Sequence, residues 1–392
     1  MTALLPLVRT RQLIVCVGAG GVGKTTTAAT IALRAALEGR RALVLTIDPA
    51  RRLANALGLQ ELGNREVRID LDAPGELWAM MLDPRATLDD VIRRVAPTEG
   101  LRKALEANRV YRHIAGSFSG SQEYMATERL FDVVTSGRYD LVVLDTPPVK
   151  NALDFLDSPG RLTRFLDKQI MKWFLAQETV GVGRRLLAGT STIVHGLLGH
   201  IFGRDFLAEL TSFFKLFGEL YEGFRERHEH VGKLFAQSTT AFLVVAAPTD
   251  TAIDVARYFL EELRHRGLPL AGLVINQVHV ASQDAPDIEG RLGAEVRSLD
   301  AEVAPRVLAR IAAAHARLRE LVRSEERRIA SIRAVGGAAV PVVQVPRLRG
   351  EVHDLQALLA LHLPLFGSAP TVVSSRTSTP SHAPAGVATE PS

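Results

Sequence analysis

The chain has a single cysteine, Cys16, among its 392 residues. One thiol excludes an internal disulfide framework and any metal site that needs two cysteines from the same chain. Long apolar runs are missing too, because no apolar window of about 18 residues is free of charge, and we therefore expect no transmembrane helix. Residues Met1–Thr10 lack the basic start and the small-residue cleavage site of a signal peptide. These absences predict a soluble, cytoplasmic protein.

A strong excess of one charge sign is also absent. The sequence has 47 Lys and Arg against 43 Asp and Glu, which leaves a formal net charge of +4. A surface of mixed charge is the expectation, and no nucleic-acid partner is predicted. Hydrophobic residues make up 47% of the chain, enough to form one large core or two.

Short apolar runs rich in β-branched residues alternate with segments of helical length. This alternation is typical of βαβ units, in which helices cover a parallel sheet. The predicted fold class is therefore α/β, with a doubly wound and mostly parallel sheet. The runs that we expect to be strands are 12–17, 41–47, 77–82, 139–144, 241–247, 270–275 and 340–345.

Two regions, roughly 88–132 and 158–237, interrupt this alternation, because they contain long helical stretches and no convincing strand. They predict an α-helical subdomain inserted into the α/β body. The chain beyond residue 366 is Ser, Thr, Pro and Ala with almost no large apolar residue. We therefore expect one domain over residues 1–366 and a disordered tail over 367–392.

Within the second insertion, six apolar residues recur at alternating spacings of four and three, which places them on one face of a helix. The face is either core between helices or a surface for an apolar client, and the sequence leaves both open. The preceding segment, Val180–Gly203, carries six glycines and is expected to be a mobile lid or a broken helix. The six residues of the stripe are Phe206, Leu210, Phe213, Phe217, Leu220 and Phe224.

The segment Gly18–Thr25, GAGGVGKT, fits the phosphate-loop pattern G-x-x-x-x-G-K-[ST] between a predicted strand and a predicted helix. Backbone N–H groups of such a turn and the helix N-terminus bind phosphate. Lys24 can reach the β- and γ-phosphates, and the Thr25 hydroxyl can bind Mg²⁺. The alternative is a glycine-rich turn with no ligand. The pattern predicts a P-loop NTPase that binds ATP and Mg²⁺ through Gly20, Gly21, Val22, Gly23, Lys24, Thr25 and Thr26.

Two aspartates follow predicted strands. Asp145 closes the run 139–144 and is interpreted as a Walker B residue that binds the metal through water, beside Thr25; a turn or cap residue is the alternative. Asp48 ends the run 41–47 and could orient the attacking water or a metal-bound water. Asp-Pro is also an ordinary turn signal, and the residues alone leave the role of Asp48 open.

With these segments placed, the sequence resembles the ArsA-type ATPase family, which includes arsenite-pump ATPases and targeting factors for tail-anchored membrane proteins. The likeness is carried by residues 12–59 and 120–156, and it recurs at 273–277 and 340–350. It implies that Asp48 positions the hydrolytic water in switch I, with Lys24 as the other catalytic residue. It also implies that Asn276 contacts adenine and that the loop Val345–Leu348, with Pro346, packs over the adenine ring.

The departures from the family are informative. Its deviant phosphate loop carries a lysine at the second position, which reaches the phosphates of the partner subunit, whereas this chain has Ala19. Arg51, Arg52 or Lys150 could supply the missing charge, or a paralogous subunit could supply the lysine. The paired cysteines that relatives use for zinc or arsenite are absent, and Cys16 is expected in the core.

Three functions remain for comparison. The first is an ATP-hydrolysing dimeric switch, a homodimer or a heterodimer with a paralog, which couples nucleotide state to binding of a hydrophobic client helix or a membrane-protein partner. The second is a nucleotide-binding regulatory subunit that pairs with a lysine-bearing paralog and hydrolyses weakly by itself. The third is a positioning or partitioning ATPase, although such proteins usually lack a large helical insertion.

Overall fold

The computed structural model describes residues 4–48, 50–96, 98–112, 121–147, 204–280, 303–348, 350 and 352–368. Lys150, the segment Val180–Gly203 and the predicted tail beyond Ser368 lie outside these ranges. Within them, no helix combines the length and the apolarity that a bilayer-spanning segment requires.

An eight-stranded sheet forms the centre of the molecule. Its strands are β1 (Leu13–Gly18), β2 (Arg41–Thr46), β3 (Val67–Ile69), β4 (Glu76–Met81), β5 (Leu141–Asp145), β6 (Thr240–Ala246), β7 (Leu270–Val278) and β8 (Val342–Pro346). Their order is β3-β4-β2-β5-β1-β6-β7-β8, and all neighbours are parallel except the antiparallel pair β3–β4 at one edge. The predicted α/β class with a mostly parallel sheet is confirmed. Because β1 lies between β5 and β6, the loop that follows it sits at the middle of the carboxyl edge.

The central strands form where the sequence offers uninterrupted apolar residues. Strands β1, β5 and β6 are buried along their whole length, as expected for parallel strands that are covered on both faces. The sequence did not predict β3, because a three-residue strand with one buried side chain carries no periodic signal.

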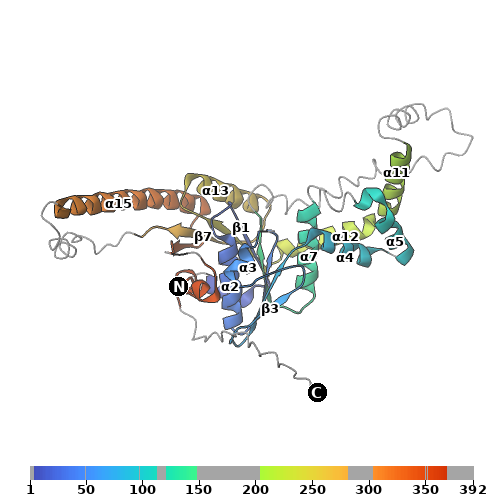
Figure 1. Ribbon diagram of the computed structural model, residues 1–392, viewed down its shortest axis with the longest axis horizontal. Helices are drawn as coiled ribbons and strands as arrows, with labels where there is room; N and C mark the ends of the chain where they lie inside the picture. The colour runs from blue at the N-terminus through green and yellow to red at the C-terminus, as the bar shows by residue number, and fades with distance from the viewer. Residues whose placement is uncertain are drawn as a thin grey trace, which may run out of the picture.

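Helices cover both faces of the sheet (Figure 1). One face packs against α1 (Leu4–Thr10), α2 (Lys24–Leu37), α3 (Arg52–Ala56), α16 (Leu355–Leu359) and α17 (His362–Phe366). The other packs against α7 (Ser121–Thr135), α12 (Tyr221–Ala236), α13 (Asp250–His265) and the C-terminal part of α15 (Val303–Gly336). Helix α15 projects from one side of the body, and a further group of helices lies on the opposite side (Figure 1).

Those remaining helices, α4 (Pro84–Val95), α5 (Glu99–Ala107) and α11 (Arg204–Gly218), gather beside the sheet and share a separate apolar cluster (Figure 1). Phe213 and Leu220, two residues of the predicted stripe, are buried in this cluster, and Leu210 packs against it. For these three residues the structure shows core packing. The side chains of Phe206, Phe217 and Phe224 lie outside the described part of the chain.

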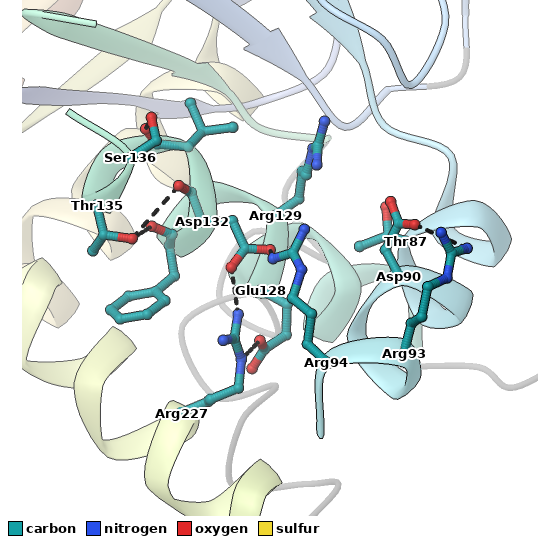
Figure 2. A network of polar contacts seen from close by, with 12 residues as sticks. Thr87, Asp90, Arg93, Arg94, Glu128, Arg129, Asp132, Thr135, Ser136 and Arg227 are labelled. Atoms are coloured by element: carbon teal, nitrogen blue, oxygen red, sulfur yellow. Dashed lines mark hydrogen bonds and ion pairs between the residues drawn. The ribbon is translucent and has the colours of Figure 1, made fainter. Parts of the chain in front are cut away.

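Two helices connect this helical group to the sheet. Helix α7 leads into β5, and α12 leads into β6. A network of charged side chains joins them: Arg227 of α12 donates to Glu128 and to Asp132 of α7, and Arg94 of α4 pairs with Asp132 (Figure 2). The three helices are therefore tied together at the base of the helical group.

Candidate nucleotide-binding site

The loop between β1 and α2 needs glycine where it passes closest to neighbouring strands. A Cβ atom on Gly18 would lie 2.0 Å from the carbonyl oxygen of Val245 on β6. Gly23 has a φ of 90°, in the left-handed region, and a Cβ there would lie 2.2 Å from the side-chain nitrogen of Asn276. A larger residue at either position would displace the loop, since the space is filled and, at Gly23, the backbone conformation itself favours glycine.

Lys24 is the first residue of α2, and only 6% of it is exposed. Its Nζ donates to the carbonyl oxygens of Gly18 at 3.0 Å and of Ala19 at 2.7 Å. Burial lowers the pKa of this ammonium, and the nearby Asp145 and Asp48 carboxylates oppose that shift. The amine is thus held across the loop, where a phosphate can take the place of the two carbonyl partners.

Asp145 is the point at which three strands and the phosphate loop meet. It ends β5, next to β1 and β2, and it is fully buried. Its Oδ2 accepts hydrogen bonds from Thr25 at 2.7 Å and from Thr46 at 2.9 Å, whereas Oδ1 has no hydrogen-bond partner among the described residues. Burial raises the pKa of Asp145 to about 6, against the lowering effect of the two hydroxyls and Lys24. An unpaired, buried carboxylate oxygen beside a threonine hydroxyl is suited to a hydrated divalent cation.

Asp48 follows β2 and leads into α3. Its backbone N–H donates to Thr46 Oγ1, and its Oδ1 accepts from the N–H of Ala50 at 3.0 Å, which is an Asx-type turn. Its Oδ2 lies 3.4 Å from a guanidinium nitrogen of Arg52. Asp48 thus makes a hydrogen bond of the kind a turn residue makes, and it also lines the cleft described next.

A cleft of about 420 Å³ opens over the loop. Asp48, Arg52, Lys24, Thr25 and Thr26 line it. A second hollow of about 490 Å³ shares part of this lining and continues toward the ends of β7 and β8. Its walls are Gly23, Thr26, Asn276, Gln277, Arg347, Leu348, Gly350, Val352 and Leu361. The pair of hollows offers one place for phosphates and an adjacent place for a base.

Only some of the residues predicted to contact the nucleotide base line the second hollow. Asn276 lines the second hollow, and its side-chain nitrogen donates to the carbonyl of Val22 at 2.9 Å. Pro346 is not part of the lining; it ends β8 opposite Val278, and the next two residues, Arg347 and Leu348, form the wall instead. Two of the four residues of the predicted loop Val345–Leu348 therefore line the hollow, whereas Pro346 is still part of the sheet. Gly20 is exposed on the turn, outside both linings.

Several lining residues were not anticipated. Gln277 lines both hollows, and its side-chain nitrogen donates to the carbonyl of Gly21 at 3.0 Å. Val352 and His353 come from a loop near the C-terminus, and Asn55 comes from α3. The polar pair Asn276-Gln277 at the end of an apolar strand was a usable signal, whereas nothing local in the sequence marks the loop that carries Val352 and His353.

The structure separates two of the three cations that could replace the family's lysine. Arg52 lines the cleft with Asp48, whereas Arg51 lines a different hollow with Leu62 and Asn64. Lys150 lies outside the described ranges. Ala19 itself is 8% exposed and packs in the core on the α2 side of the sheet. Cys16 is fully buried in β1, and burial raises the pKa of its thiol, in keeping with the expected core role.

The central strand of the mostly parallel sheet runs through a glycine-rich loop into a helix. A lysine, a threonine and an aspartate at the end of a strand surround the cleft over this loop. These features together define a P-loop NTPase. Comparison with known proteins narrows this class. The pattern of the anion-transporting ATPase family, ArsA, matches residues 11–302, and the chain belongs to this family. The protein is therefore an ATPase.

Individual relatives agree with this assignment. The chain is 26% identical over 262 residues to "ATPase GET3" of Podospora anserina and 28% identical over 263 residues to "ATPase get3" of Aspergillus terreus, in each case over 67% of this chain and 71% of the relative. It is also 27% identical over 309 residues to "ATPase ARSA1" of Chlamydomonas reinhardtii, which covers 74% of this chain and 37% of that protein.

Proposed function

We propose that this ATPase is a dimeric switch that couples its nucleotide state to binding of a hydrophobic client, such as the membrane segment of a tail-anchored protein. The observation that carries the proposal is the position of α7. Its C-terminal end leads into β5 and hence to Asp145, and its Glu128 and Asp132 bind Arg227 of α12. Helix α7 therefore connects α4 and α12 to the strand that ends at Asp145, and a connection of this kind can transmit a nucleotide-dependent movement.

Nucleotide and metal would be held by the residues around the first cleft. The loop Gly20–Thr26 would bind the phosphates, with Lys24 on the β- and γ-phosphates. Thr25 would bind Mg²⁺ directly and Asp145 through water, which would give the unpaired Oδ1 of Asp145 a partner. The cation supplies charge neutralisation on the phosphate oxygens. Asn276 and the Arg347–Leu348 wall would hold the adenine.

Hydrolysis would depend on Asp48, which faces the cleft from switch I and would position the attacking water. Arg52 is placed beside Asp48 and is the described candidate for the charge that the family's lysine supplies elsewhere. A cation near the transferred phosphoryl group stabilises the negative charge of the transition state. We therefore propose hydrolysis that is slow in the free subunit and that depends on Arg52.

The client would be bound by the helical groups of two subunits, brought together by ATP and separated after hydrolysis. The test uses a fluorescent peptide carrying a hydrophobic tail, with a peptide in which the tail leucines are serines as its control. Capture and particle mass are measured for the wild type, Lys24→Ala and the exposed control Lys233→Ala, with ATP, with ADP and with neither. Capture that ignores the nucleotide, or that survives Lys24→Ala, would refute the switch.

Ala19 supports a second candidate, a regulatory subunit that relies on a paralog. Because Ala19 is buried and uncharged, this chain cannot place a lysine from that position on a partner's phosphates. The discriminating measurement is ATP turnover before and after mixing with a lysine-bearing paralog. A large rise that is lost when the paralog's lysine is replaced favours the regulatory subunit, and unchanged turnover favours the homodimeric switch.

A further inference from the structure

Two consecutive side chains at the end of β7 hold two consecutive carbonyls of the phosphate loop. The Asn276 side-chain nitrogen donates to Val22, and the Gln277 side-chain nitrogen donates to Gly21. In a regular strand, neighbouring side chains point to opposite faces, so Asn276 and Gln277 could not both reach the same loop. The end of β7 must therefore depart from regular geometry.

The departure is at Gln277. Its φ is 62°, and among the described residues it is the one non-glycine residue with a positive φ. The pairing of β7 with β8 shifts register between Ile275 and Val278, which brackets the same position. A left-handed residue of this kind is strained relative to an extended one, and such strain persists only where surrounding contacts enforce it.

Those contacts lie immediately after Gln277. The carbonyl of Val278 accepts from the N–H of Arg347 at 2.9 Å. The backbone N–H of His279 donates to Glu325 of α15 at 2.9 Å, and the His279 ring lies 2.7 Å from the same carboxylate. Glu325 is 4% exposed, and α15 is packed on the sheet through Ile329 and Ile332. The turn at Gln277 is therefore fixed from β8 and from α15.

The two side-chain bonds determine how the loop peptides face. In a trans peptide the C=O and the following N–H point in opposite directions. When Gly21 and Val22 direct their carbonyls to β7, the N–H groups of Val22 and Gly23 face away from β7. Successive backbone N–H groups left free of protein carbonyls in this way are what a phosphate-binding loop presents to an anion.

We propose that Gln277 is a positioning residue for nucleotide binding, which holds the Gly21 peptide in its phosphate-binding orientation through its left-handed backbone and its amide. The proposal rests on nucleotide binding by the loop, which is part of the function proposed above. Gln277 acts through the loop and not through the base, so its effect is the same for any nucleoside diphosphate. The side-chain N–H of Gln277 is the group that holds the Gly21 carbonyl. The left-handed backbone at Gln277 directs this side chain to the loop.

The test compares Gln277→Gly, which keeps the positive φ without strain and removes the amide, with Gln277→Glu, which exchanges the donor for an acceptor of the same shape. Gln344→Glu is the matched control, because Gln344 is exposed on β8 and lines neither hollow. Dissociation constants for ADP and for inosine diphosphate are measured by calorimetry, with unfolding temperatures alongside.

We expect Gln277→Gly to raise both dissociation constants by the same factor, about 3- to 10-fold, the worth of one hydrogen bond. Gln277→Glu is expected to raise them further, and Gln344→Glu to leave them unchanged. In turnover, KM should rise with little change in kcat. Unequal factors for the two nucleotides would overturn the proposal in favour of a base contact, and unchanged affinities in Gln277→Gly would overturn it outright. If the wild type binds neither nucleotide, the proposed function fails instead.

Discussion

Arg227 of α12 binds the carboxylate of Glu128 of α7, whose side chain is completely buried. The guanidinium also lies 5.4 Å from the centre of the Phe131 ring and donates to Asp132 at 2.6 Å. The neighbouring acids raise the pKa of Arg227, although burial opposes them. The pair joins the helix that leads to β5 with the helix that leads to β6 (Figure 2).

We predict that Arg227→Met lowers the free energy of unfolding by about 3 kcal/mol, because it takes the cation away from a buried carboxylate. The double variant Arg227→Met/Glu128→Gln should be less destabilised than the sum of the two single variants. Urea denaturation of the wild type, Arg227→Met, Glu128→Gln and the double variant measures this coupling. Arg93→Met is the control, since its ion pair with Asp90 is 60% exposed at Arg93 and is worth little. Additive effects would show that the pair is not coupled.

Asp48→Asn should reduce ATP turnover by about 100-fold or more, in the range of a lost general base or water-positioning group, while ATP still binds. The reason is that the cleft keeps Lys24 and Thr25 but loses the carboxylate that faces it. Steady-state phosphate release and equilibrium ATP binding separate the two effects. Asp140→Asn is the matched control, because Asp140 pairs with Arg41 just before the start of β5, at the opposite end of that strand from Asp145. Wild-type turnover in Asp48→Asn would remove Asp48 from the mechanism.

Arg52→Ala should lower kcat by about 10- to 100-fold, because it removes the cation nearest to Asp48 in the cleft. Arg51→Ala, one residue away but facing another hollow, should stay within about 2-fold of the wild type, as surface substitutions usually do. Turnover of both variants at saturating ATP is the measurement. Equal losses in the two variants would point to a structural effect on α3 in place of a role in catalysis.

His362 gives a pH dependence of stability. It is fully buried on α17 against Phe366, its ring nitrogens have no hydrogen-bond partner among the described residues, and burial together with Arg34 lowers its pKa from 6.5 to about 4. His362 therefore binds a proton below about pH 6.5 in the unfolded chain, but only below about pH 4 in the folded protein. The contribution of neutral His362 to the free energy of unfolding is thus fully present above pH 6.5, and it is lost as the pH falls toward 4.

We expect His362 alone to reduce the free energy of unfolding by about 1.4 kcal/mol between neutral pH and pH ~5.5. In His362→Phe, which keeps an aromatic ring at this site, that part of the pH dependence should disappear. Urea titrations of both proteins at the two pH values give the difference between them, which cancels the other titrating groups. Parallel pH profiles would show that His362 is not responsible.

Phe213→Ala should destabilise the helical group by about 3–5 kcal/mol, because Phe213 is 2% exposed within its apolar cluster. Hydrogen exchange of α5 and α11 reports this local loss, and exchange of β1 should remain slow. Protection in α5 and α11 that is unchanged by the substitution would mean that Phe213 contributes little to the core and is available to a client.

Local patterns were sufficient for some features and not for others. The phosphate loop could be read directly, because Gly18–Thr25 carries its glycines, lysine and threonine within one turn. The stripe Phe206–Phe224 could not be divided between core and surface, since periodicity fixes a face of a helix and not what covers it. Which residues of Val345–Leu348 line the second hollow could not be predicted, because the last paired residue of a strand depends on its neighbour strand.

By itself, the sequence determined the α/β class, the match of Gly18–Thr25 to the phosphate-loop pattern and the absence of a lysine at position 19, since each is a property of adjacent residues or of a repeated spacing. Only the tertiary structure decided which of the candidate cations faces Asp48, that Asp145 is shared by Thr25 and Thr46, and that Gln277 is turned onto Gly21. The contacts of Asp145 and of Gln277 join residues that are 99 to 256 positions apart. They depend on strand order and on one left-handed backbone angle, and neither is encoded in a local pattern.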